Sequence, residues 1–214
     1  METRQLFIAI VDISGYTGFL RRHKSNLIHA ERIIIDLLQS IVCTAKGPLI
    51  LHEVTGDAVT FHAYGENTEE TASIILQRIQ QCIEEVQKNQ AVMLANGCPV
   101  CAESELGAKA IVHFGTTVIS HIGTYTKVAG PEVIFAHRLL KNSITHDSYI
   151  LMTSSFYNVL EDFCSSHAYW QLEDGAEFGE VAVLVWYPDR EDVDATLTHH
   201  VTRAPRGKTL AYCR

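Results

Sequence analysis

The chain has 214 residues, of which 47% are hydrophobic and 20% are charged, an ordinary composition for one globular domain with a proper core. Lys and Arg number 17 against 25 Asp and Glu, which gives a formal net charge of -8. A surface that binds DNA or RNA needs a basic footprint, so this balance argues against a nucleic-acid partner. The sequence shows no secretory signal and no apolar run of membrane-spanning length, so we expect a cytoplasmic protein with reduced cysteines and no membrane contact.

Two aspartates stand at the ends of predicted strands. Residues 52–61 read as two short strands joined by a tight turn at Gly56 and Asp57, since Gly followed by Asp suits a turn with positive φ. Asp12 ends the apolar run over residues 6–11. If these strands are neighbours, the two carboxylates converge and can hold Mg²⁺ against a triphosphate. Two unrelated turn aspartates are the alternative interpretation.

The segment after the first strand contains a glycine turn and a basic patch. Thr17 is a candidate N-cap for the following helix. The basic patch, residues 21–24, is most simply a solvated face, and contact with a triphosphate is the alternative.

Two helices are predicted in the first half of the chain. Apolar residues at helical spacing predict one over 27–41, stopped by Lys46-Gly47-Pro48. The second begins at Asn67, which has capping-box spacing to Glu70, and extends to about Ala91. The order strand, helix, strand, strand, helix, strand predicts an α+β fold with a ferredoxin-like β-α-β-β-α-β core.

The second half of the chain predicts a third helix and several more strands. Alternating residues predict a strand over 109–114, and Gly115 marks a turn into another over 116–123. Further elements are expected as strands over 148–152, 168–172 and 181–187, with a short helix from Ser154 or Ser155 after the first of them. We therefore expect one domain over residues 1–187 with extra C-terminal strands, followed by a polar extension over 188–214.

The third helix follows Gly130, with Pro131 at its first position, where the missing N–H costs nothing. On it, Ile134, Arg138 and Lys141 share one face by their spacing. This face therefore combines one apolar and two basic side chains.

A loop insertion near residues 95–105 contains Cys98 and Cys101. Zinc needs four ligands, and no second pair lies nearby in the sequence. A redox motif would begin a helix in a thioredoxin-like unit, which this segment does not do. A plain loop with two thiols is one interpretation, and a Zn²⁺ site completed by another loop or subunit is the other.

Three stretches together resemble the catalytic domain of class III adenylyl and guanylyl cyclases. Residues 7–17, FIAIVDISGYT, resemble the family strand with D-I-x-G-F-T, and residues 55–59, TGDAV, resemble its G-D-x-V/M hairpin. Residues 109–139 resemble R-I-G-I-H-x-G followed by G-x-x-V-N-x-A-x-R-L. The match covers residues 5–187 in order and spacing, and its details resemble a bacterial branch recorded as a domain of unknown function.

The resemblance implies an enzyme that converts ATP or GTP to a cyclic nucleotide and pyrophosphate at a homodimer interface. Asp12, Ile13 and Asp57 match the positions that hold two Mg²⁺ or Mn²⁺ ions. Arg138, supplied by the other subunit, matches the arginine that stabilises charge on the transferring phosphate. The nucleotide-binding motifs also include Gly15, Tyr16, Thr17 and Gly56.

The resemblance also indicates where the chain departs from the family. Glu53 and Lys127 fall at the base-selecting positions; Glu53 can accept from the edge of guanine, whereas Lys127 fits neither family pattern and could pair with Glu53 instead. Ile134 replaces an orienting Asn, and residues 177–181 are acidic where the family has a phosphate-binding Lys. Such losses remove hydrogen bonds to the transition state. A non-catalytic relative that binds a nucleotide or a partner protein is therefore the alternative function.

Overall fold

The structure, a computed structural model, describes residues 1–97, 106–160, 163 and 165–189. The Cys98 and Cys101 pair and nearly all of the predicted C-terminal extension lie outside these residues. Within them, eight strands form one mixed sheet in the order β2-β3-β1-β4-β6-β8-β7, with β5 paired to β4. Its strands are β1 (Glu2–Ser14), β2 (Ile50–Thr55), β3 (Ala58–Tyr64), β4 (Gly107–Ile122), β5 (Tyr125–Ala129), β6 (Tyr149–Thr153), β7 (Ala168–Asp174) and β8 (Glu180–Trp186).

Five α-helices and two short 3-10 turns connect the described strands. They are α1 (Tyr16–Arg22), η1 (Lys24–Asn26), α2 (Leu27–Thr44), α3 (Thr68–Ala95), α4 (Pro131–Arg138), α5 (Ser154–Tyr157) and η2 (Ala176–Phe178). The segment β1-α2-β2-β3-α3-β4 has the sheet order β2-β3-β1-β4 and confirms the predicted ferredoxin-like core. None of the helices in this part of the chain has both the length and the apolar character needed to cross a membrane.

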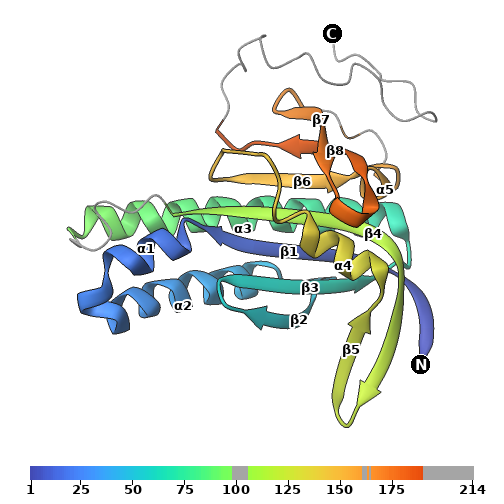
Figure 1. The fold of residues 1–214 in the computed structure, drawn as a ribbon, viewed down its shortest axis with the longest axis horizontal. Coiled ribbons are helices and arrows are strands. Elements are labelled where there is room, and N and C mark those ends of the chain that lie inside the picture. Colours follow the sequence, from blue (N-terminus) through green and yellow to red (C-terminus); the bar gives the residue numbers. More distant parts are fainter. Residues whose placement is uncertain (98–105, 161–162, 164, 190–214) are drawn as a thin grey trace.

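The two faces of the sheet are covered differently (Figure 1). Because strand side chains alternate, Phe7, Ala9 and Val11 belong to the large core cluster with α2 and α3, while Ile8 and Ile10 belong to a second cluster with α4. The long helices α2 and α3 cover the first face, and the eight-residue α4 lies across the second. By the same alternation, Asp12 and Lys109 project on the face that carries α4.

The first strand runs past Asp12 to Ser14, directly before the glycine turn, and pairs with β3 as far as Asp12 and with β4 as far as Ser14. Two helix starts differ from the prediction. Thr17 is not an N-cap: α1 begins at Tyr16 after Gly15, whose φ of 80° suits glycine. The capping box at Asn67 is not formed, since Asn67 has a φ of 47° and makes no side-chain cap, and α3 extends to Ala95.

The turn predicted at Gly115 is absent from the structure, because β4 runs unbroken from Gly107 to Ile122. The reason for a glycine there is space. A Cβ on Gly115 would lie 2.8 Å from Cγ of Glu132, so the missing side chain allows α4 to approach the sheet. The actual turn comes later, at Gly123, where φ is 61° before β5.

Candidate active site

The register of β1 and β3 brings Asp12 beside the hairpin turn that contains Asp57. Asp12 pairs with Ala58 in the antiparallel ladder, and the backbone N–H of Ile13 donates to the Asp57 carbonyl at 3.1 Å. Gly56, with a φ of 61°, makes the tight turn that the sequence predicts. The backbone itself therefore places the two aspartates next to each other, as expected from the sequence.

The two carboxylates interact with each other and with one lysine. Burial raises the pKa of Asp12, and the Lys109 ammonium, 3.0 Å from Oδ2, acts in the opposite direction. Burial also raises the pKa of Asp57, and the neighbouring charge of Asp12 raises it further. Two half-buried acids in this state are stabilised by added positive charge. This is an environment suited to a cation.

The described residues contain no group of three or more His, Cys, Asp or Glu side chains arranged to hold a metal ion. The donor set here is smaller: two carboxylates and nearby backbone carbonyls. Mg²⁺ commonly takes only one or two protein carboxylates and fills its other positions with water or phosphate oxygens. The chemistry of Asp12 and Asp57 therefore fits Mg²⁺ or Mn²⁺ bound together with a triphosphate.

The first turn of α1 lies beside these aspartates. Gly15 begins the helix, and the Tyr16 hydroxyl donates to Glu31 at 3.2 Å. Burial raises the pKa of Tyr16, with further contributions from Glu31 and from Asp57. The motif residues 12–17 and the hairpin turn therefore form one corner of the molecule.

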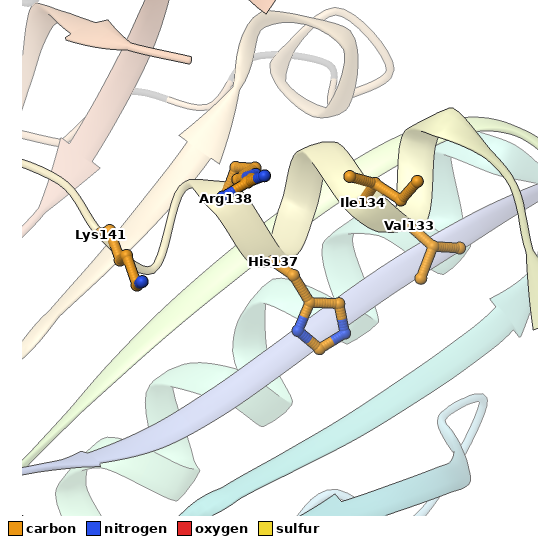
Figure 2. A pocket seen from close by; sticks show the side chains of 5 residues that line it. All are labelled: Val133, Ile134, His137, Arg138 and Lys141. Carbon is orange, nitrogen blue, oxygen red and sulfur yellow. The ribbon is translucent and has the colours of Figure 1, made fainter. Parts of the chain in front are cut away.

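The helix α4 presents the basic side chains of the site. Gly130 and Pro131 start it as the sequence predicts, and it ends at Arg138, so Lys141 lies beyond the helix. A shallow pocket of about 330 Å³ is lined by Val133, Ile134, His137, Arg138 and Lys141. Figure 2 shows His137 and Val133 leaving the helix toward β1 and β3, while Ile134 and Arg138 leave it on another side.

Arg138 is partly exposed and has a partner in its own chain. Its Nε lies 3.4 Å from Oε1 of Glu177, and both side chains are half-exposed. Glu177 belongs to η2, which packs on α4 through the rings of Phe135 and Phe178, whose centroids are 5.1 Å apart. The acidic segment found in place of the family lysine therefore contacts the candidate catalytic arginine, and the guanidinium remains reachable from outside the chain.

The candidate base-selecting residues lie on β2 and β5, which contact each other. In the described part of the chain, Glu53 and Lys127 form no ion pair, contrary to one alternative drawn from the sequence. The strands meet instead through the rings of His52 and Tyr125, stacked with centroids 5.9 Å apart. Glu53 also raises the pKa of His137, against a larger lowering by burial, so these two side chains are close enough to interact electrostatically.

Two residues of this site were missed by sequence reasoning. Lys109 is the first residue of the motif that resembles R-I-G-I-H-x-G, but only the register of β1 and β4 shows that it faces Asp12. His137 precedes Arg138, and its orientation toward the sheet follows from the helix that the sequence predicts. A helical projection of residues 131–138 would have indicated it.

Comparisons with known proteins agree with this architecture. The adenylyl cyclase CyaB from P. aeruginosa superposes with a TM-score of 0.67 at 16% identity, covering 91% of this chain and 100% of that one. The non-canonical dimeric guanylyl cyclase domain of the RhoGC fusion protein from the aquatic fungus Blastocladiella emersonii gives a TM-score of 0.62 at 15% identity, covering 87% of this chain and 98% of that one. A class III adenylyl cyclase-like ATP-binding protein from Pseudomonas aeruginosa gives 0.60 at 12% identity, covering 75% and 35%. At these identities the likeness establishes the fold alone.

Sequence comparison gives the family. The uncharacterized protein Rv2561/Rv2562 of Mycobacterium tuberculosis (strain ATCC 25618 / H37Rv) is 29% identical over 132 residues, which are 59% of this chain and 60% of that relative's length. The model of the family described as "Protein of unknown function (DUF2652)" matches residues 34–149, more than half of the chain. The chain therefore belongs to this family, and it has the fold of class III adenylyl and guanylyl cyclase domains.

Proposed function

We propose that the protein is a class III nucleotide cyclase that converts a nucleoside triphosphate to a cyclic nucleotide and pyrophosphate at a homodimer interface. The observation that supports this most is the placement of Asp12 beside Asp57 by the β1 and β3 register. Two half-buried acids with raised pKa values are costly for the fold alone. A site for cations and phosphate gives them a chemical purpose.

Asp12, Asp57 and the carbonyl of Ile13 are the groups that would hold two Mg²⁺ or Mn²⁺ ions. When bound, such ions supply Lewis acidity, which lowers the pKa of the ribose 3′-hydroxyl and neutralises triphosphate charge. The Lys109 ammonium pairs with the Asp12 carboxylate and opposes the rise in its pKa that burial causes. Tyr16 and Thr17, in the adjacent first turn of α1, line the same corner and would contact the phosphates.

Arg138 of one subunit would face the Asp12 and Asp57 of the other. Its planar fork matches phosphate oxygens, and its half exposure allows a second copy to reach it. It must exchange Glu177 for phosphate when nucleotide binds. Each homodimer would then contain two equivalent sites, each built from both subunits.

The base contacts would come from Glu53 and Lys127, on β2 and β5. Because Glu53 is not paired with Lys127, its carboxylate can accept from the N–H groups at the edge of guanine. This favours GTP over ATP. Lys127 fits neither base pattern of the family and leaves both nucleotides as candidates.

A second candidate function is a nucleotide-binding module that does not turn over its ligand. Two observations favour it. Ile134 stands at the position of the orienting Asn, and the Arg138 guanidinium is paired with the Glu177 carboxylate. One protein of similar fold is itself described as a class III adenylyl cyclase-like ATP-binding protein. In this case the same acids would bind a metal and nucleotide without cyclisation.

The direct test is incubation of purified protein with each of ATP, GTP, CTP and UTP and Mn²⁺, followed by chromatography of the products. We expect one cyclic nucleotide and pyrophosphate in equal amounts. Asp57→Asn and Arg138→Ala should each keep only a small residual activity alone, yet their mixture should recover about a quarter of the wild-type rate, because half of the dimers are mixed and each mixed dimer has one intact site. Metal-dependent binding with no product from any triphosphate would contradict the cyclase and support the binding module.

A further inference from the structure

His113 is a buried histidine that binds the first turn of α4. It lies on β4 with only 3% of its surface exposed, and its Nε2 is 2.6 Å from Oε2 of Glu132. A carboxylate only accepts hydrogen bonds, so Nε2 is the protonated nitrogen. Nδ1 lies within hydrogen-bonding distance of two hydroxyls, those of Thr153 at 3.0 Å and Ser155 at 3.2 Å.

This network joins four elements of the fold. Thr153 ends β6 and accepts from the backbone N–H of Phe156 as the N-cap of α5. The ring of Phe135, from α4, packs edge-on against His113 with centroids 5.2 Å apart. Burial lowers the pKa of His113, which favours the neutral ring, although Glu132 opposes this shift. The Glu132 carboxylate is therefore held by a buried ring that Thr153, Ser155 and Phe135 hold in place.

The sheet is shaped to receive Glu132. Gly115, two residues from His113 and on the same face of β4, lies directly under this side chain: a Cβ there would fall 2.8 to 2.9 Å from its Cγ, Cδ and Oε2 atoms. Glu132 falls at a variable position of the cyclase-like motif over residues 130–139. The pairing of Glu132 with His113 is thus a feature of this chain's own residues.

The contacts at the two ends of α4 are unequal. A helix of eight residues is marginal without tertiary contacts. At its C-terminal end, among the residues that the structure describes, Arg138 has a half-exposed contact with Glu177, and exposed ion pairs stabilise little. At its N-terminal end Glu132 has a short hydrogen bond to a buried donor. Ala136 and Leu139 pack α4 onto the sheet through apolar contacts, and the polar contact that fixes its N-terminal end is at Glu132.

We propose that His113 and Glu132 form a latch that positions α4, and through it Arg138, over the sheet. Glu132 is thus a positioning residue: it lies six residues, or about 9 Å along the helix axis, from Arg138 and acts through it. The inference about catalysis rests on the proposed function of Arg138. The inference about the position of α4 does not.

The test compares Glu132→Ala with Glu132→Gln, whose amide oxygen can accept the same hydrogen bond. Glu132→Ala should lower kcat about 10- to 100-fold with little change in KM, and Glu132→Gln should recover most of it. The matched control is Glu70→Ala, which removes a first-turn glutamate of α3. Equal losses in the Gln and Ala variants, or an unchanged kcat in both, would overturn the latch.

A double variant tests whether Glu132 acts through Arg138. In an Arg138→Ala background, followed at high enzyme concentration, Glu132→Ala should cost no further activity, since the group that it positions is gone. A full additional loss would overturn a role through Arg138.

Amide hydrogen exchange tests the latch without turnover, so it remains informative if no triphosphate is cyclised and the proposed function fails. Glu132→Ala should speed exchange over residues 131–138 at least about tenfold while α3 keeps its protection. Equal acceleration in both helices would mean a general loss of stability and would overturn the latch.

Discussion

The two halves of the candidate site are held by different kinds of contact. Asp12 and Asp57 are fixed by the β1 and β3 ladder and by the hydrogen bond from Ile13 to the Asp57 carbonyl. Arg138 lies on a short helix, half-exposed, beside an acidic side chain from η2. A residue whose position is fixed by backbone pairing keeps that position when nearby side chains are substituted. A residue held by a few side-chain contacts moves when those side chains change. Two of the departures from the cyclase motifs, Ile134 and the acidic segment that contains Glu177, fall in the second half.

The largest expected effect is at the sheet-held half. Asp57→Asn keeps the shape of the side chain and the backbone carbonyl that accepts the hydrogen bond from Ile13 N–H. It removes the negative charge that would bind the metal. We expect a loss of activity on the order of 10³-fold or more, and loss of Mn²⁺-dependent nucleotide binding in calorimetry. The thermal midpoint should stay equal or rise, because Asp12 no longer faces a second buried charge. Undiminished binding would place the metal elsewhere.

The next effect concerns Ile134, at the position where the family motif has Asn. Its side chain is 52% exposed, so Ile134→Asn should cost little stability. If the cyclase proposal is right, a restored hydrogen bond to the transition state should raise kcat about tenfold. Ile28→Asn, on the exposed side of α2, is the control for a polar substitution at an exposed isoleucine. An unchanged kcat would mean that the chain orients the ribose by another group.

A smaller effect tests Lys109, which pairs with Asp12 in the sheet-held half. Lys109 lowers the pKa of Asp12 against the larger effect of burial, so Lys109→Met should raise that pKa further. Mn²⁺ binds the ionised acid, so the acid limb of Mn²⁺ binding should move to higher pH. At pH 8, where the acid is ionised in both proteins, loss of the competing ammonium should tighten Mn²⁺ binding about fivefold.

Folding stability should follow the same sign. An acid whose pKa is higher in the folded than in the unfolded chain makes folding less favourable as it ionises. Because Lys109→Met raises the pKa of Asp12 further, the variant should lose more folding stability than the wild type as pH rises from acid to neutral. Denaturant unfolding at several pH values measures this, with Lys127→Met as the control away from Asp12. A pH profile of Mn²⁺ binding identical to the wild type would show that Lys109 and Asp12 are not coupled.

Sequence reasoning was most successful where local patterns decide the structure. The hairpin at Gly56, the start of α4 at Pro131 and the ferredoxin-like strand order follow from turn chemistry and from hydrophobic periodicity, and all are confirmed. It failed at Gly115, where the glycine makes room for Glu132 rather than a turn. That reason is a contact between β4 and α4, and no local pattern contains it.

The same limit applies to the site. The resemblance to the cyclase motifs names Asp12, Asp57 and Arg138 as candidates, because each lies in a recognisable local stretch of the sequence. Their partners come from segments distant in the sequence. Lys109 contacts Asp12 from the neighbouring strand β4, and Glu177 contacts Arg138 from η2. Pairing between distant segments depends on register and packing, so only the folded chain reveals that both candidate catalytic charges have partners within one subunit.

The smallest expected effect is at Glu177, and it bears most directly on the difference between the two halves. Glu177→Gln removes the acid that faces Arg138, and a half-exposed ion pair is worth no more than about 1 kcal/mol, so kcat should rise by at most about fivefold. Glu180→Gln, an exposed acid at the start of β8, is the matched control. Because salt screens exposed charges, the gain should fade at high ionic strength. A fall in kcat would instead mean that Glu177 orients Arg138 for its task, which would make the second half of the site as preorganised as the first.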